Sequence, residues 1–413
     1  MKQLFTTPLA LIALNLAAPA VVAQSISEKN LREHIGYLAS DELQGRGTST
    51  DGEKKAADYL AKQFRKYGLK PMGTDGYYYP FTFKTNPNPH DTATANLPLR
   101  NGLDVVGFLD NGAENTVIIG AHFDHLGLGK DRNSLQANSE GMIHNGADDN
   151  ASGTAGMLEL ARHFSQNKEK EPFNFLFMGF SAEELGLLGS KKWCEAPTYP
   201  LEKVNYMLNM DMIGRLNPDS RTLLVYGVGT SPVWVPLLDG LTSSFKVVKD
   251  SSGIGPSDQT SFYLKNIPVL HFFTGQHGDY HKPSDDADRI NYAGERDVLE
   301  YMLAVINQTK DKGKLAFLTT RNTSMTRSAF RITMGVMPDY AFDGTGMRID
   351  GVTNGKPGQI AGLQKGDVLI HMGDDDVKNV EGYMKALAKV KKGDTVKVKV
   401  LREGREKEVE VTF

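Results

Sequence analysis

Histidine and carboxylate side chains recur in five short segments of the chain: 121–125, 146–153, 179–184, 209–212 and 280–285. Imidazole nitrogens and carboxylate oxygens are ligands of zinc, and a catalytic zinc keeps one position open for water. Two metal ions about 3.5–4 Å apart need a bridging ligand, which a carboxylate with two oxygens can supply. If the five segments meet in the fold, their residue types predict a metal site that activates water.

Taken singly, each segment has a simpler interpretation. Glu183-Glu184 could be a solvated helix start, because acidic residues favour the first turn. Residues 148–150 could form a calcium loop or a helix cap, and His122 could be a buried core histidine. The occurrence of all five segments in this order in one chain favours a metal site over five separate structural roles. The sequence has no H-E-x-x-H motif, no G-x-S-x-G elbow and no phosphate-binding P-loop.

The surrounding pattern predicts an α/β domain. Short apolar runs alternate with helix candidates at 153–165, 185–193, 233–245 and 294–309. This alternation is typical of a mostly parallel central sheet flanked by helices, in which sites form at the carboxyl ends of the strands. Nearer the N-terminus, the pattern from about residue 31 to residue 68 is helical and ends at Gly68.

In this order, the five segments resemble the secreted di-zinc aminopeptidase family that includes aminopeptidase Y, glutamate carboxypeptidase II and glutaminyl cyclase. The resemblance covers about residues 30–310 and implies the zinc exopeptidase fold, two zinc ions per chain and removal of N-terminal residues from peptides by a metal-bound hydroxide. It also implies a non-proline cis peptide bond between Asp148 and Asp149. The roles it implies are His122 and Asp211 on one zinc, Glu184 and His281 on the other, Asp148 as the bridge, Glu183 as general base, and Asp124 orienting His122.

Related activities remain open at this point. Carboxypeptidase or glutaminyl cyclase activity could use the same set of residues, and the transferrin receptor resembles the family without binding the metals. A non-catalytic peptide-binding protein is therefore the alternative of another class, although the intact acidic and imidazole set argues against it. Four further histidines are given structural or pocket roles: His125, His144, His271 and His277.

The last part of the chain has a β texture. After a linker at 313–328, residues 329–413 resemble a PDZ domain of the bacterial envelope-protease type, chiefly through the run 357–369. The resemblance implies that a peptide adds a strand to the sheet, with its terminal carboxylate held by the loop from Met334 to Met337. The alternative is a stability module that binds no ligand.

The charge balance and the N-terminal segment indicate which partners and which cellular location to expect. The 47 Lys and Arg residues are balanced by 50 Asp and Glu residues, so we expect no nucleic-acid partner. Residues 1–23 are typical of a signal peptide, which predicts a periplasmic or secreted peptidase domain at 24–312 without stable membrane insertion. The single cysteine, Cys194, excludes an intramolecular disulfide.

Overall fold

A computed structural model describes residues 25–84, 98–131, 133–320, 333–338, 344–352, 355–378, 380–387 and 389–413. The predicted signal peptide at 1–23 and the linker residues 321–328 lie outside this part of the chain. Within the described residues, no helix is both long and apolar enough to span a bilayer.

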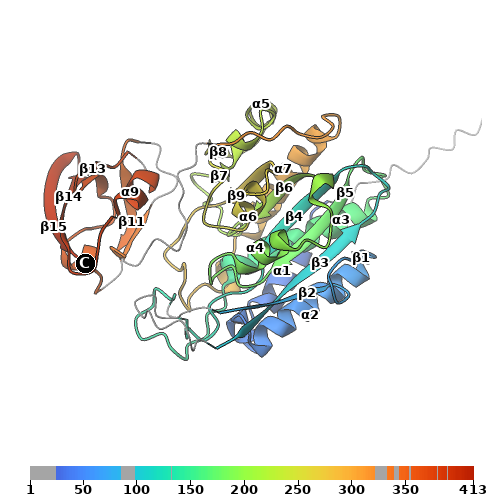
Figure 1. Ribbon diagram of the computed structural model, residues 1–413, viewed down its shortest axis with the longest axis horizontal. Coiled ribbons are helices and arrows are strands. Elements are labelled where there is room, and N and C mark those ends of the chain that lie inside the picture. The colour runs from blue at the N-terminus through green and yellow to red at the C-terminus, as the bar shows by residue number, and fades with distance from the viewer. Residues whose placement is uncertain are drawn as a thin grey trace, which may run out of the picture.

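A nine-stranded sheet forms the centre of the first domain (Figure 1). Its order is β1-β3-β5-β4-β6-β9-β7-β8, with β2 paired to β3. The central pairs β5/β4, β4/β6 and β6/β9 are parallel, whereas β3 and β7 join this core in antiparallel pairing. The predicted α/β class is therefore confirmed, with antiparallel margins around a parallel core. The strands are β1 Lys70–Pro71, β2 Tyr78–Phe83, β3 Arg100–Leu109, β4 Thr116–His122, β5 Asn174–Phe180, β6 Val204–Met210, β7 Thr222–Tyr226, β8 Lys246–Lys249 and β9 Val269–Phe273.

Helices cover both faces of this sheet. Every residue of β4, β5 and β6 is buried, as expected for strands packed on both sides. Along β4, Val117 and Ile119 join the core under α1, α2, α3, α5 and α7, whereas Ile118 joins the core under α4 and α6. Each buried aliphatic side chain contributes about 1.5–3 kcal/mol, so the two cores fix the strand ends that carry the site. The helices are α1 Glu28–Leu38, α2 Asp51–Lys66, α3 Gly153–Gln166, α4 Leu188–Glu195, α5 Trp234–Gly240, α6 Gln259–Tyr263 and α7 Tyr292–Thr309.

The single helical pattern predicted for about 31–68 is wrong, because the chain leaves the helix after Leu38 and begins α2 at Asp51. In between, Gln44, Gly45 and Arg46 have φ angles of 46°, 71° and 51°. These left-handed values are incompatible with a continuous α-helix. Gly45 has no space for a side chain, since a Cβ there would lie 2.3 Å from the carbonyl oxygen of His144. The break thus brings the segment 45–48 against the loops of the candidate site.

The second domain is an antiparallel sheet in the order β10-β11-β12-β14-β15, with β13 paired to β12. Val398 and Val400 of β14 are buried, whereas Lys397 is exposed and Lys399 half-buried, as their alternation predicts. The elements are β10 Val336–Pro338, β11 Met347–Val352, α8 Pro357–Ile360, β12 Val368–Met372, β13 Asp375–Asp376, α9 Val380–Leu387, β14 Thr395–Arg402 and β15 Arg405–Thr412.

Contacts of the first domain continue past the boundary expected at residue 312. Leu315 is buried in its core, and the Leu315 amide donates to Asn205 Oδ1 at 2.8 Å. Farther along, the amide of Thr320 donates to the Tyr263 hydroxyl at 3.0 Å. The chain therefore stays attached to the first domain up to Thr320.

Candidate metal centre

The carboxyl ends of the central strands deliver the predicted side chains to one edge of the sheet. His122 is the last residue of β4, Glu183 and Glu184 follow β5, and Asp211 follows β6. Because β4, β5 and β6 run parallel, these ends lie side by side. His281 reaches the same place from the loop after β9, and Asp149 from the turn before α3.

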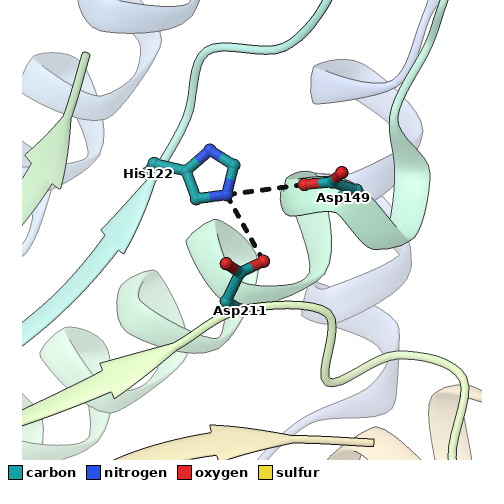
Figure 2. Close-up of side chains that lie close together, drawn as sticks. All are labelled: His122, Asp149 and Asp211. Atoms are coloured by element: carbon teal, nitrogen blue, oxygen red, sulfur yellow. Dashed lines mark ion pairs between the residues drawn. The ribbon is translucent and has the colours of Figure 1, made fainter. Parts of the chain in front are cut away.

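One group of potential ligands is centred on His122. Its Nε2 atom lies 3.4 Å from Oδ1 of Asp149 and 3.3 Å from Oδ1 of Asp211. Dashed lines mark both pairs in Figure 2. The Asp211 oxygen is buried and forms no hydrogen bond of ordinary geometry. All three side chains point toward one position between a strand end, a turn and a second strand end, which is the arrangement expected of metal ligands.

A second group faces the other oxygen of the same aspartate. The Nε2 atom of His281 lies 3.2 Å from Oδ2 of Asp149 and 3.2 Å from Oε2 of Glu184. Asp149 therefore presents Oδ1 to His122 and Oδ2 to His281. One carboxylate thus faces both histidines, each through a different oxygen.

The separations between each histidine nitrogen and its two carboxylate oxygens fit a shared cation. Zinc bonds of about 2.0–2.1 Å at tetrahedral angles place neighbouring ligand atoms about 3.3–3.4 Å apart. The observed 3.2–3.4 Å agrees with that spacing, which is longer than most N–H···O hydrogen bonds. The imidazole and carboxylate donor set also suits zinc.

The negative charge of the buried carboxylates in the site would be stabilised by a bound cation. Burial alone would lower the pKa of His281, but Glu184 and Asp149 raise it well above its ordinary value. Burial, followed by the charge of Glu184, raises the pKa of Asp149 to about 7. Carboxylates crowded in a low-dielectric site each favour positive charge nearby, and a divalent ion supplies it.

The bridging position corrects one sequence-based assignment. Asp148, expected to be the bridge, turns its carboxylate away from both groups. Its Oδ1 accepts from the amide of Gly214 at 2.7 Å, and its Oδ2 lies 3.1 Å from Nε2 of His277. The non-proline cis peptide bond is likewise one residue later than expected, between Asp149 and Asn150. Neighbouring residues in a turn project in different directions, and the spacing of the acids does not reveal which one faces the histidines.

Asp124 lies behind His122, but it contacts the ring through its backbone. Nδ1 of His122 is 3.2 Å from the carbonyl oxygen of Asp124 and 3.7 Å from its carboxylate. The carboxylate instead accepts from the Thr48 hydroxyl at 2.9 Å and from the amide of Glu183 at 3.1 Å. Asp124 thus connects the segment 45–48 to the backbone of the predicted general base.

Other side chains hold the second group in place. His125 Nδ1 donates to Oε1 of Glu184 at 2.9 Å, and burial lowers the pKa of His125 to about 3, so the ring is neutral. His125 could also complete a set of ligands with Asp149 and Glu184, but its Nδ1 is 3.9 Å from Asp149. Since His281 is 3.2 Å from both carboxylates, we infer that His125 orients Glu184. Tyr280 stacks on His281 with ring centroids 3.9 Å apart.

A cavity of about 80 Å³ opens beside the two groups. Its polar lining includes Glu183, Glu184, Asp149, Asp211 and His281. The apolar wall of the cavity consists of Met212, Tyr226, Pro256, Phe273 and Tyr280, and His271 and Gln276 complete the lining. A small molecule bound there would be close to both the candidate ligands and aromatic side chains.

Comparison with known proteins agrees with this geometry. Residues 104–306 match the model of peptidase family M28, and residues 319–413 match that of the PDZ domain. Residues 104–306 are therefore similar to peptidase family M28, and residues 319–413 to a PDZ domain.

Among curated relatives, leupeptin-inactivating enzyme 1 of Streptomyces exfoliatus is 26% identical over 289 residues, which cover 68% of this chain and 57% of that protein. Aminopeptidase YwaD of Bacillus subtilis is 30% identical over 182 residues, which cover 41% of this chain and 39% of the relative. The chain thus spans between about two fifths and three fifths of the length of these relatives.

Solved structures share the fold. BSAP, a zinc aminopeptidase from Bacillus subtilis, superimposes with a TM-score of 0.55 at 17% identity, over 70% of this chain and 98% of that one. A glutaminyl cyclase from Bacteroides thetaiotaomicron gives 0.54 at 18% identity, over 69% and 98%. At these identities the likeness is one of fold.

Proposed function

We propose that the chain is a zinc aminopeptidase that removes N-terminal residues from peptides and binds two zinc ions. The observation that carries this proposal is that Asp149 faces His122 through one oxygen and His281 through the other, beside one cavity. His122, Asp149 and Asp211 would hold one ion, and His281, Asp149 and Glu184 the other. The match of residues 104–306 to family M28 and the aminopeptidases among the relatives of the chain support the same activity.

Bound zinc lowers the pKa of water and polarises the carbonyl group of the scissile bond. Side chains of the protein itself would transfer the proton and exclude water from the substrate. Glu183 lines the cavity next to the ligand Glu184, where its carboxylate can accept a proton from the attacking water and return it to the leaving amine. Its backbone amide donates to Asp124, which fixes the start of this segment. The apolar wall would exclude water from the part of the substrate that it contacts.

A digest of blocked peptides tests the activity. Peptides with free or acetylated N-termini and free or amidated C-termini are incubated with the zinc-loaded chain, with and without chelator, and analysed by mass spectrometry. Stepwise loss of residues from free N-termini alone is expected. Loss from the C-terminus would indicate a carboxypeptidase, loss of ammonia from an N-terminal glutamine a cyclase, and no product from a zinc-loaded chain a binding protein.

We also propose that the PDZ domain binds peptides through a free C-terminus. Within the described residues, β10 pairs only with β11, which leaves its other edge able to accept a peptide strand. Gly335, next to β10, has a φ of 74°. Titration of a Glu183→Gln chain, which should not digest the probe, with free and amidated peptides tests this proposal. Equal or undetectable binding of the two would contradict it.

We further propose that residues 1–23 are an export signal and that the enzyme acts in the periplasm or outside the cell. The basic residue before an apolar run, followed by small residues, supports this proposal. Fractionation of expressing cells with N-terminal mass analysis tests it. We expect exported protein that begins at Gln24, whereas an intact Met1 in the cytoplasmic fraction would contradict it.

A further inference from the structure

Arg46 is a cation buried beneath the candidate metal centre. Its side chain is 0% exposed, and the guanidinium donates only to backbone carbonyl oxygens in the hydrogen bonds described. Nε donates to Phe123 at 2.7 Å, Nη1 to Asn145 at 2.6 Å and to Leu38, and Nη2 to Gly146 at 2.9 Å. Four hydrogen bonds thus use most of the five N–H donors, as a buried charge requires to be tolerated.

Three of these four carbonyl groups belong to the two turns that carry candidate metal ligands; the fourth, that of Leu38, ends α1. Phe123 follows His122 directly, and Asn145 and Gly146 lead into the turn that presents Asp149. One planar guanidinium therefore joins a turn of one donor group to the turn of the bridging carboxylate. The rigid fork fixes the distance between its acceptors, which an ammonium group on a flexible stem does not do.

The backbone around Arg46 adds to this connection. The carbonyl oxygen of Arg46 accepts from the amide of His125 at 3.2 Å, and that of Gly45 accepts from Gly127 at 3.0 Å. Gly47 is also closely packed, because a Cβ there would lie 3.0 Å from the Cα of Gly127. The segment 45–47 is thus wedged against the loop that follows His122.

Two opposite effects on zinc binding follow from this position. The positive charge of Arg46 repels an incoming cation, whereas its hydrogen bonds pre-organise the ligands. Loss of outer partners that orient ligands typically weakens metal binding about 10- to 100-fold. The carboxylates of Asp149, Asp124 and Glu184 already outnumber the single charge of Arg46 near the site. Ordering of the turns should therefore exceed the repulsion.

We propose that Arg46 is a positioning residue that sets the spacing between the turns of His122 and Asp149 and thereby strengthens zinc binding. The inference rests on the proposed function of the same site. Two variants separate charge repulsion from ordering of the ligands. Arg46→Lys keeps the positive charge and loses the planar guanidinium, and Arg46→Met loses both.

The test measures zinc affinity of the metal-free chain by competition with a chromophoric chelator, together with thermal unfolding of the metal-free chain. Both variants should bind zinc about 10- to 100-fold more weakly than wild type. Wild-type affinity in Arg46→Lys, or tighter binding in Arg46→Met, would overturn the proposal, as would lower stability with unchanged affinity. The matched controls are Arg65→Lys and Arg65→Met at an exposed position on α2, which should leave zinc affinity unchanged.

A third variant covers the case in which neither Arg46 substitution folds. Gly47→Ala keeps the guanidinium but pushes the segment away from Gly127, so zinc affinity should fall several-fold. Unchanged affinity in a folded Gly47→Ala chain would overturn the inference. If wild type binds no zinc, the proposed function itself fails, and this result is distinct from equal binding by wild type and the variants.

Discussion

Nε2 of His281 lies 3.2 Å from Oδ2 of Asp149, on the opposite side of that carboxylate from His122. The two histidines are 159 positions apart in the chain. Asp149 is therefore the residue on which both donor groups depend, and its neighbour Asp148 provides a matched control of the same type and burial.

Replacement of the bridge should remove the metals. Asp149→Asn removes the carboxylate that the two donor groups share and leaves two ligands in each group. We therefore expect loss of most bound zinc and of activity. Asp148→Asn should retain zinc, because this side chain contacts Gly214 and His277 instead. Elemental analysis after gel filtration measures both variants. Zinc retained by Asp149→Asn and lost by Asp148→Asn would restore the assignment made from the sequence.

Glu183→Gln should separate metal binding from turnover. The amide cannot accept the proton from water, so kcat should fall about 10²- to 10⁴-fold while zinc content stays at the wild-type level. Glu195→Gln, at an exposed position on α4, should have wild-type kcat. Near-normal turnover by a zinc-loaded Glu183→Gln chain would mean that another group accepts the proton.

The apolar wall of the cavity should determine which N-terminal residues are removed. Met212, Tyr226 and Phe273 offer no charge to a substrate side chain. We therefore expect kcat/KM for leucyl or methionyl substrates to exceed that for alanyl substrates by at least about 10-fold, with acidic residues slower still. Initial rates on a series of aminoacyl anilides measure this preference. A faster rate on the aspartyl than on the leucyl substrate would mean that the side chain of the N-terminal residue does not bind against the apolar wall.

Glu53 should make the stability of the fold depend on pH. Burial raises the pKa of Glu53 from 4.5 to about 8, although the Ser181 hydroxyl and the Ser49 amide donate to its carboxylate. Below pH 4.5 both folded and unfolded states are protonated. As the pH rises toward 8, only the unfolded state loses its proton, so the free energy of unfolding falls by a few kcal/mol at most.

Glu53→Gln removes this dependence while keeping an amide that can form both hydrogen bonds. Chemical denaturation of the metal-free chain at several pH values should show a smaller decline for the variant than for wild type. Groups that titrate in both proteins cancel in the difference. Parallel curves for the two proteins would contradict a raised pKa at Glu53.

Much of the fold could be predicted because buried strands have a simple signature. The uninterrupted apolar run in β4 and the alternation in β14 both reflect which faces are covered. His122, Glu184 and Asp211 were found because they stand at strand ends, where a parallel core must bring them together. Their place follows from the sheet and needs no knowledge of loop conformation.

The remaining features depend on backbone geometry that periodicity does not encode. The choice between Asp148 and Asp149 is made by the turn before α3, where two adjacent acids point to different sides. The role of Arg46 depends on left-handed residues that interrupt a pattern otherwise typical of a helix. One signal was available, since Gly45 and Gly47 flank a cation and mark a place where the backbone approaches another segment closely.

The central claim is that Asp149 bridges two zinc ions, and an anomalous-scattering map from crystals of the zinc-loaded chain tests it most directly. The account predicts two zinc peaks, one between Asp149 Oδ1 and His122 and one between Asp149 Oδ2 and His281. A single peak on Asp148, or no peak at either position in a chain saturated with zinc, would contradict it.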